Sequence, residues 1–200
     1  MSAAKPLQKS RPESTIPESQ GLSGSTGHRP IVDGEVKLAV TRALIEGVLI
    51  FEDIRNELGA IEALLQYMQL KRWDPMEVIL QEGTIGSEMY VLIEGRAIVV
   101  KSTPDGDTYH VANLEGAARP SFGEGALIDT EARTATICAE TTVVCLVLMR
   151  SNFEKFSAEH PHWAIPIYHR IAGAVLTRLR KTNNDLMLLY KALGAEIRGH

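Results

Sequence analysis

The sequence contains few cysteines, no long hydrophobic run and no excess of positive charge, and each shortage excludes a class of protein. The 2 cysteines are too few for the disulfide framework of a small secreted domain. No run reaches the roughly 18 apolar residues of a membrane-spanning helix, and the N-terminus lacks the apolar core of a secretory signal. The net charge of −4 argues against a general nucleic-acid-binding protein. We therefore expect a cytoplasmic protein that binds neither a membrane nor nucleic acid directly.

Patterns typical of enzymes and metal sites are also scarce. We find no Ser–His–Asp spacing, no P-loop and no paired carboxylates suited to acid–base catalysis. His160 and His162 flank a proline as in half of a metal-binding motif, but they fall at a helix boundary without further ligands downstream. The sequence therefore predicts a protein that is not an enzyme and that has no catalytic residues, no metal and no cofactor.

Composition and periodicity separate the N-terminal part of the chain into two segments. Residues 1–34 are rich in Ser, Pro and Gly and contain almost no large apolar side chain, which predicts a disordered or extended segment. Residues 35–72 place apolar side chains three and four apart, as helices do. Gly59 separates two of these N-terminal helices.

Residues 73–150 have a different period. Short β-rich runs alternate there with Gly, Pro, Asp and Thr turns, which predicts a small β-barrel or jelly roll. Within it, Cys138 and Cys145 are expected to face each other across a hairpin that turns at Thr141 and Thr142. We interpret both cysteines as reduced packing residues.

Residues 151–200 return to helical spacing. Ser151 is expected to cap a first helix, and a longer helix follows from about Pro161 to the end. Apolar residues recur along it as in a coiled-coil heptad, with Thr182 as the interruption: Tyr168, Ala172, Val175, Leu179, Leu186, Leu189 and Leu193. Such a face should pack on the barrel, on a second copy or both, and we predict a homodimer. A cluster of basic residues on this helix is interpreted as a solvated face: Arg170, Arg178, Arg180 and Lys181.

In the stretch FGEGALIDTEARTAT, residues 122–136, the segment 123–126 that follows the phenylalanine is too small to pack a core. Gly123 and Gly125 let a ligand approach the backbone closely. The short helical turn that begins at Glu124 offers free N–H groups to an anion, and Arg133 can bind the same anion with two N–H bonds. Glu124 is an acceptor and suits a hydroxyl instead. An anion and a hydroxyl together describe a nucleotide with a free 2′-OH.

This stretch resembles the phosphate-binding cassette of cyclic-nucleotide-binding domains, the modules of catabolite activator proteins, cyclic-nucleotide-dependent kinases and cyclic-nucleotide-gated channels. The matching residues are Phe122, Gly123, Glu124, Ala126, Leu127, Arg133, Thr134, Ala135 and Thr136. Residues 77–100 resemble the first strands of the same family, including Gly83, Gly86, Gly95 and the pair Met89 and Tyr90. The family usually has a hydrophobic residue where this chain has Gly125 and a proline where it has Ala132.

The resemblance implies a mainly β fold with flanking helices: a cyclic-nucleotide-binding-type β-barrel (a double-stranded β-helix or jelly roll) with N-terminal helices and a long C-terminal helix. It also implies that Glu124 binds the ribose 2′-OH and that Arg133 binds the cyclic phosphate. Thr134 should add a hydroxyl, and the backbone N–H groups of Gly125 and Ala126 should surround the phosphate. The predicted ligand-binding residues are Phe122, Gly123, Glu124, Gly125, Ala126, Leu127, Arg133, Thr134 and Ala135. From the residues alone, the alternatives are a surface salt bridge from Arg133 to Glu131 or Asp129, and a solvated Glu124.

The implied ligand is cGMP or cAMP. Thr134 favours cGMP slightly, because in the family a threonine after the arginine is frequent in cGMP-preferring sites. The family's helix after the barrel covers the bound base, and here the polar cluster Thr182, Asn183 and Asn184 lies where that helix could cross it. Asn both donates and accepts hydrogen bonds and suits a purine edge. The alternative is an exposed Asn pair that only weakens the helix.

The resemblance to activator-type transcription factors ends at the C-terminus. Those proteins carry a helix-turn-helix domain after the long helix, and this chain, ending at His200, is expected to leave no room for one. We therefore expect a stand-alone, non-catalytic receptor for a cyclic mononucleotide that signals through its flanking helices to an unidentified protein partner. The alternative is a scaffold or docking module of the same fold that binds no mononucleotide, or that binds a cyclic dinucleotide.

Overall fold

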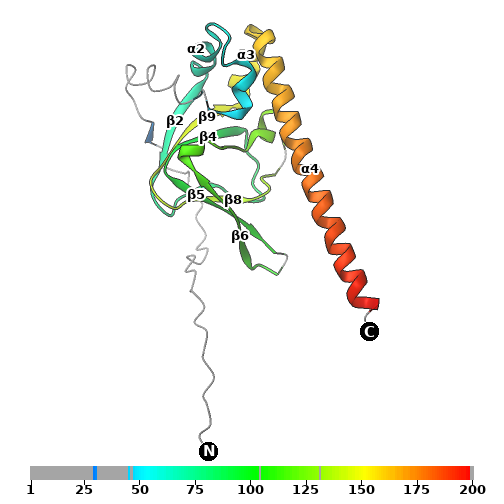
Figure 1. Ribbon diagram of the computed structural model, residues 1–200. Helices are drawn as coiled ribbons and strands as arrows, with labels where there is room; N and C mark the ends of the chain where they lie inside the picture. Colours follow the sequence, from blue (N-terminus) through cyan, green and yellow to red (C-terminus); the bar gives the residue numbers. More distant parts are fainter. Residues whose placement is uncertain (1–28, 31–44, 46, 104, 131, 199–200) are drawn as a thin grey trace, which may run out of the picture.

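The β-rich runs of the sequence fold into two antiparallel sheets, with helices packed on one of them (Figure 1). The computed structural model describes residues 29–30, 45, 47–103, 105–130 and 132–198. The elements are β1 (Arg29–Pro30), η1 (Leu49–Ile54), α2 (Ala60–Leu65), β2 (Met68–Trp73), β3 (Val78–Leu80), β4 (Glu88–Glu94), β5 (Arg96–Ser102), β6 (Thr108–Glu115), η2 (Gly116–Ala118), β7 (Ser121–Phe122), η3 (Glu124–Leu127), β8 (Thr136–Ala139), β9 (Val143–Met149), α3 (Arg150–Glu159) and α4 (Pro161–Arg198). The predicted mainly β fold, with flanking helices and a long C-terminal helix, is confirmed.

The chain passes repeatedly between the two sheets. One sheet has the order β1-β2-β9-β4-β7 and the other the order β3-β8-β5-β6. Strands β7, β8 and β9 are consecutive in sequence and alternate between the sheets. The connection from β7 to β8, residues 123–135, therefore runs from the edge of the first sheet to the interior of the second, and this connection contains most of the predicted ligand-binding residues.

Strand β4 is buried on both faces because it separates two hydrophobic cores. Side chains alternate across a strand, so Met89, Val91 and Ile93 point into a core shared with the helices. Tyr90 and Leu92 point into a second core between the sheets. The helix-side core also contains Phe51, Leu64, Phe153, Phe156 and Ile171. Burial on both faces explains why β4 reads as a nearly continuous apolar run.

The expectation that helices extend to residue 72 is wrong. Met68–Trp73 forms strand β2, which pairs with β9 in register from Met68↔Leu148 to Trp73↔Val143. Met68 continues the helical spacing of the residues before it, but pairing with an interior strand outweighs this local pattern. The first described helix is the 3-10 helix η1, and α2 follows Gly59, which has a φ of +80°. The rest of the predicted first helix, 35–44 and 46, lies outside the described residues.

The predicted disordered or extended segment, residues 1–34, is described only at Arg29–Pro30. These two residues form β1, which pairs with β2 at the edge of the larger sheet. Here the chain is extended and docked. The prediction for the other residues of this segment lies outside the described part of the chain.

Helix α3 begins earlier than predicted. Its N-cap residue is Met149, whose side chain makes no capping hydrogen bond, and Ser151 already lies inside the helix. Strand β9 leads directly into α3, and the side chain of Arg150 in the first turn is held by acceptors in the 126–130 segment. This tertiary contact, rather than a local cap, fixes the start of the helix.

Cys138 and Cys145 do not face each other across a hairpin. Strands β8 and β9 belong to different sheets, so Cys138 is in register with Ile98, whereas Cys145 is in register with Leu92. Both cysteines are free, and burial raises the pKa of both thiols. They therefore act as packing residues in the thiol form, as expected.

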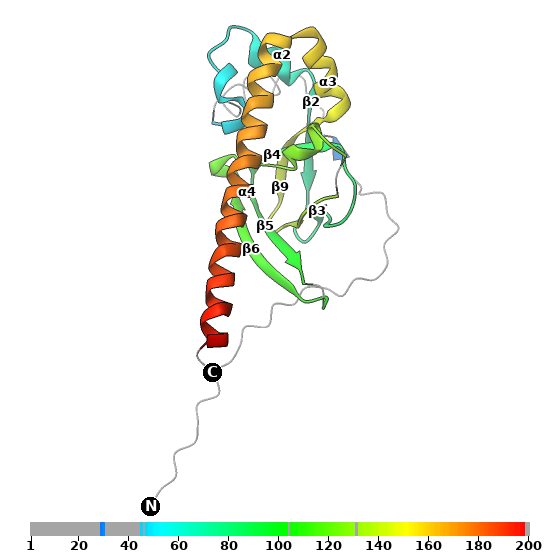
Figure 2. The ribbon, with the colours of Figure 1, turned by 90° about the vertical axis from the view of Figure 1, so that its right-hand side faces the viewer.

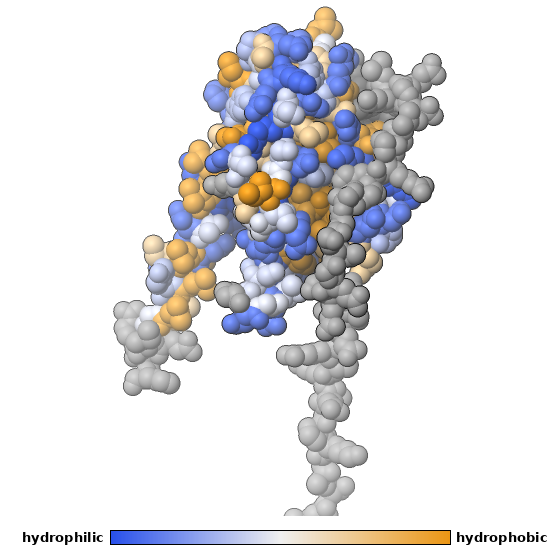
Figure 3. All heavy atoms as spheres, turned by 180° about the vertical axis from the view of Figure 1, so that it is seen from behind, coloured by the Kyte–Doolittle hydropathy of each residue, from blue (hydrophilic) through white to orange (hydrophobic). Residues whose placement is uncertain are grey.

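Helix α4 packs on the core only near its start. Ala164, Ile167 and Ile171 are buried, whereas every residue from Ala172 to Leu193 is exposed. In Figures 1 and 2 the C-terminal end of α4 extends past the β5–β6 hairpin. Figure 3 shows apolar residues along this exposed part. Within the described ranges, no helix combines the length and the apolar character needed to cross a membrane.

Gly95 is required at the turn from β4 to β5. Its φ is +86°, and an added Cβ would lie 2.1 Å from the carbonyl oxygen of Thr142. Gly106 has a similar φ of +91° but no atom within 4 Å of an added Cβ. Gly106→Ala should therefore cost about 1–2 kcal/mol in backbone strain alone, and Gly95→Ala should cost about 1–3 kcal/mol more because of the clash. Urea unfolding of both variants measures the difference, and equal free energies of unfolding would contradict the clash.

Candidate functional site

The cassette, residues 122–136, is fixed at its start by both hydrophobic cores. Phe122 stacks on Tyr90 between the sheets, with ring centroids 5.3 Å apart and an interplanar angle of 7°. Burial raises the pKa of Tyr90, with the neighbouring Glu88 charge as a smaller cause, so this phenol stays neutral. Leu127, at the end of η3, lies in the helix-side core. The intervening residues, including Glu124, are therefore held in one position.

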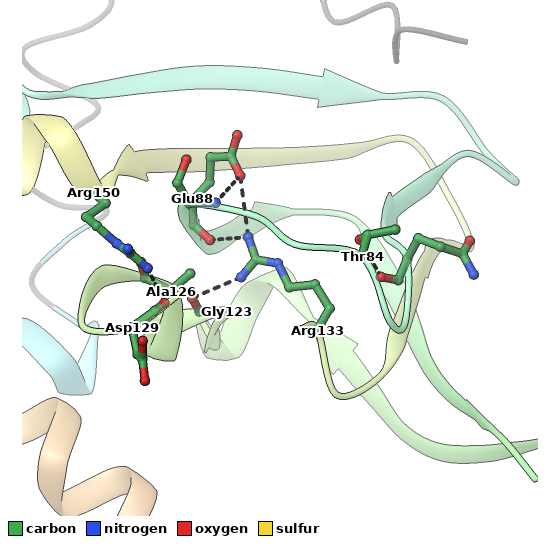
Figure 4. Close-up of polar contacts among 9 residues, drawn as sticks. Thr84, Glu88, Gly123, Ala126, Asp129, Arg133 and Arg150 are labelled. Atoms are coloured by element: carbon green, nitrogen blue, oxygen red, sulfur yellow. Dashed lines mark hydrogen bonds and ion pairs between the residues drawn. The ribbon is translucent and has the colours of Figure 1, made fainter. Parts of the chain in front are cut away.

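The Arg133 backbone is paired on both sides. Its N–H donates to the carbonyl of Thr84 at 2.8 Å, and its carbonyl accepts from the N–H of Gly83 at 2.9 Å. Both partners belong to the loop after β3, where Thr84 appears in Figure 4. Residues 83 and 84 thus fix the point from which the Arg133 side chain projects.

The Arg133 guanidinium is buried, with 7% of the residue exposed. Nη2 donates to the carbonyl of Glu88 at 2.7 Å, and Nη1 donates to the carbonyl of Gly123 at 3.2 Å (Figure 4). The Glu88 carboxylate lies 3.4 Å from Nη2. The alternative of a surface salt bridge is wrong because the guanidinium is not at the surface. Its partners are mainly neutral carbonyls, so an anion would be a stronger partner than those it has.

Two glycines make room for this guanidinium. An added Cβ at Gly86 would lie 2.5 Å from Nη2 of Arg133 and 2.8 Å from Nε. An added Cβ at Gly123, which has a φ of +73°, would lie 2.8 Å from Nη1. In the sequence, Gly86 matches the family only as one of the turn glycines of residues 77–100. In the structure, its lack of a side chain leaves space for the Arg133 guanidinium.

Glu124 is also buried, with 3% of the residue exposed, so the alternative of a solvated carboxylate is wrong. Its Oε1 accepts a hydrogen bond from Nη2 of Arg178 at 2.6 Å. Its Oε2 is buried and accepts no hydrogen bond from the described residues. A buried oxygen without a donor is costly and can be satisfied by a hydroxyl.

The backbone of η3 is partly engaged. The N–H of Ala126 donates to the carbonyl of Gly123 at 3.1 Å, so binding a phosphate would require it to change partner. Gly125 is exposed, and nothing lies within 4 Å of an added Cβ. Thr134 is exposed and Ala135 is half-buried beside Arg133. The expected contacts of these residues with a phosphate stay a prediction.

Arg150 is a functional candidate that sequence reasoning missed. From the first turn of α3 its Nε donates to the carbonyl of Ala126 at 2.6 Å and its Nη1 to Oγ1 of Thr130 at 2.5 Å. Nη2 also contacts the carbonyl of Asp129 (Figure 4). Arg150 therefore connects the C-terminal end of η3 to α3. Its partners are two backbone carbonyls and one threonine hydroxyl, so no sequence pattern marks it.

The interpretation of the basic cluster on α4 as a solvated face holds for Arg180 and Lys181, which are exposed, but it is incomplete for Arg178, which is exposed and also paired, and wrong for Arg170, which is half-buried. Arg170 forms a bidentate pair with Asp53 at 2.7 and 2.5 Å, and its hydrogen bonds hold the pKa of that carboxyl below its usual value. Arg178 pairs with Glu124. A helical wheel was the available signal, because Arg178 lies seven residues, about two turns, beyond Ile171 on the same side of the helix.

Of the predicted lid residues, the structure brings one to the barrel side of α4. Residues four apart share a helix face, so Thr182 follows Arg178, and its hydroxyl donates to the Arg178 carbonyl at 3.1 Å. Asn183 and Asn184 are rotated from Thr182 by about 100° and 200°. All three are exposed. In this conformation Asn183 and Asn184 do not lie on the barrel side of α4.

The site combines a buried guanidinium, a buried carboxylate with one oxygen that accepts no hydrogen bond from the described residues, and bare backbone between them. This arrangement suits a ligand that carries an anion and a hydroxyl group. Among the residues that the structure describes, no group of three or more His, Cys, Asp or Glu side chains is placed to hold a metal ion.

Residues 70–160 match the family described as Cyclic nucleotide-binding domain. The chain is 28% identical to the cAMP-dependent protein kinase regulatory subunit of Dictyostelium discoideum, over 67% of this chain and 41% of that protein. It is 29% identical to the CRP-like cAMP-activated global transcriptional regulator of Mycobacterium tuberculosis, over 65% of this chain and 55% of that protein. The chain thus spans about half the length of these curated relatives.

A solved structure of a cyclic nucleotide-binding domain has a similar fold. The cyclic nucleotide-binding domain from Methylobacillus flagellatus superposes with a TM-score of 0.61, over 74% of this chain and 84% of that chain. The sequence identity is 22%, so this likeness concerns the fold alone.

Gly86→Ala should displace the Arg133 guanidinium, whereas Gly173→Ala on α4 should not, because an added Cβ there meets no atom of the described residues within 4 Å. A steric cost of about 1–3 kcal/mol at the guanidinium corresponds to a loss of cyclic-nucleotide affinity of about 5- to 150-fold. Calorimetric titration of both variants tests this. Equal affinities would show that the guanidinium position does not matter for binding.

Proposed function

Because residues 70–160 form a domain of the cyclic nucleotide-binding family, we propose that the chain is a non-catalytic receptor for a cyclic mononucleotide, cGMP or cAMP. The observation that carries this proposal is the buried Arg133 guanidinium, held mainly by carbonyl oxygens beside a buried Glu124 with one unpartnered oxygen. Relatives whose names describe cAMP-dependent regulation support it.

Binding would proceed by exchange of partners at Arg133. The cyclic phosphate replaces the Gly123 carbonyl as acceptor for Nη1, because a charged acceptor forms the stronger hydrogen bond. The Ala126 N–H turns from the same carbonyl toward the phosphate. The Glu88 carbonyl continues to orient Nη2. The ribose 2′-OH donates to Glu124.

The signal would pass from η3 to the C-terminal helices. Arg150 ties the end of η3 to α3, and the start of α4 packs in the same core through Ile167 and Ile171. A shift of η3 on phosphate binding therefore moves the α3–α4 unit. A ligand changes this equilibrium only by its different affinity for the two positions. The altered position of α4 is then read by a protein partner.

We also propose that the chain forms a homodimer through α4. The heptad positions Val175, Leu179, Leu186 and Leu189 are all exposed, although each is a large apolar side chain. A contiguous apolar stripe of this spacing is typical of a coiled-coil interface.

Arg133→Ala should cost about 2–5 kcal/mol of cyclic-nucleotide binding free energy, because it removes the counter-charge of a buried anion. Arg72→Ala is the matched control, since Arg72 is a surface arginine paired with Asp74. Competition binding against a labelled cyclic nucleotide measures both. If Arg133→Ala binds as tightly as Arg72→Ala, the receptor proposal fails and the docking-module alternative gains support.

Thr134→Ala should lower the ratio of cGMP to cAMP affinity by about 3–10-fold, the equivalent of one hydrogen bond from the threonine hydroxyl to the guanine 2-amino group. Thr134→Ser keeps the hydroxyl and should keep the ratio. The test is a pair of titrations for each variant. An unchanged ratio in Thr134→Ala would remove the argument for cGMP.

Leu186→Lys should convert the dimer to a monomer, because it places a charge in the centre of the apolar stripe. Leu188→Lys is the control: Leu188 is as exposed as its neighbours but lies outside the heptad positions. Light scattering after size exclusion should give twice the 22.0 kDa chain mass for the wild type and for Leu188→Lys. A monomeric wild type would contradict the dimer.

A further inference from the structure

Helix α4 contacts the proposed ribose-binding carboxylate of its own chain. Nη2 of Arg178 donates to Oε1 of Glu124 at 2.6 Å, and the two residues are 54 positions apart in the sequence. The pair is asymmetric: the Glu124 side chain is 4% exposed, whereas the Arg178 side chain is 65% exposed. The guanidinium therefore reaches from solvent to a buried carboxylate.

A ribose hydroxyl does not reach Glu124 in this conformation, although Oε2 still lacks a donor among the described residues. Oε1 is paired with Arg178, and Oε2 is enclosed without a hydrogen-bond donor among the described residues. A hydroxyl can reach the carboxylate only if Arg178 leaves or η3 shifts. Arg178 is the easier group to move, because most of its side chain is already solvated.

The same ion pair restrains α4. Arg170 and Ile171 fasten the start of the helix to η1 and the core. From Ala172 onward the helix is exposed, and Arg178 meets Glu124 about 12 Å further along the helix axis than Arg170. The Arg178–Glu124 pair is therefore a second point, beyond the buried start, at which α4 is joined to the barrel.

We propose that Arg178 blocks the ribose position of this site and that a 2′-hydroxyl ligand must exchange the Arg178–Glu124 pair, which releases the exposed half of α4. This proposal rests on the proposed function, and it assigns Arg178 as a specificity-determining residue. A cyclic nucleotide with a free 2′-OH competes for Glu124 and frees the helix. A 2′-deoxy analogue binds through its phosphate and leaves the pair intact.

The test compares Arg178→Gln with Arg180→Gln. Both remove one positive charge from α4, but Arg180 is exposed and lies about 200° around the helix from Arg178. Arg178→Gln should bind cAMP or cGMP about 2–5-fold more tightly than the wild type, the range expected when a partly exposed ion pair no longer competes. Its affinity for the 2′-deoxy analogue should be unchanged. Arg180→Gln should match the wild type for both ligands.

The dependence of the binding affinity on salt concentration provides a second test. Added NaCl screens the partly exposed pair, so the affinity ratio of Arg178→Gln to wild type should fall toward one as the salt concentration rises. Weaker binding of the ribose ligand by Arg178→Gln would overturn the proposal, because Arg178 would then support the ligand rather than compete with it. Equal effects of the two substitutions would also overturn it, because charge alone would then explain the result.

A measurement without nucleotide separates this proposal from the proposed function. Spin labels at Asp185→Cys on α4 and Thr108→Cys on β6, in a Cys138→Ser background diluted with unlabelled protein, report the distance between helix and barrel. Arg178→Gln should broaden the distance distribution, and Arg180→Gln should not. A broadened distribution without nucleotide binding would refute the receptor function but keep the restraint. An unchanged distribution in Arg178→Gln would refute the restraint itself.

Discussion

The burial of the Arg133 guanidinium is the constraint on which the rest of the site depends. A buried charge needs hydrogen-bond partners on every side, and here carbonyls from two separate segments, at Glu88 and Gly123, supply them. Their approach is possible only because residues 86 and 123 lack side chains. The close approach of β4, the loop after β3 and η3 therefore follows from one charged group. The same group gives the cassette its affinity for an anion.

Much of the fold follows from the sequence because its signals are local. The alternating and continuous apolar runs of β4 and β9 predict strands, and the glycines on either side of Glu124 predict close approach of a ligand. Strand β2 could not be predicted, because its pairing with β9 outweighs a helical spacing that continues through Met68. The prediction that Ser151 caps α3 is wrong for a similar reason, because a contact of Arg150 with a segment distant in sequence fixes the start of the helix.

The site residues divide in the same way. Arg133 and Glu124 are recognisable because their types and spacing carry the chemistry. Arg178 lies 54 residues after its partner, and its position on α4 also fits a solvated face. A sequence pattern shows which residue types the site requires, but it does not show which distant arginine contacts Glu124. That information lies in the packing of α4 against η3, and it links the ligand to the helix that would carry the signal.

The central claim is that a cyclic phosphate takes the place of the Gly123 carbonyl as the partner of Arg133 Nη1. Heteronuclear NMR of the arginine side-chain N–H groups, with the Arg133 signal assigned from an Arg133→Lys sample, observes this exchange directly. On titration with cAMP or cGMP, the account predicts that the Arg133 signals shift and become protected from exchange with water, while the Arg72 signals do not move. A saturating titration that leaves the Arg133 signals in place would contradict it.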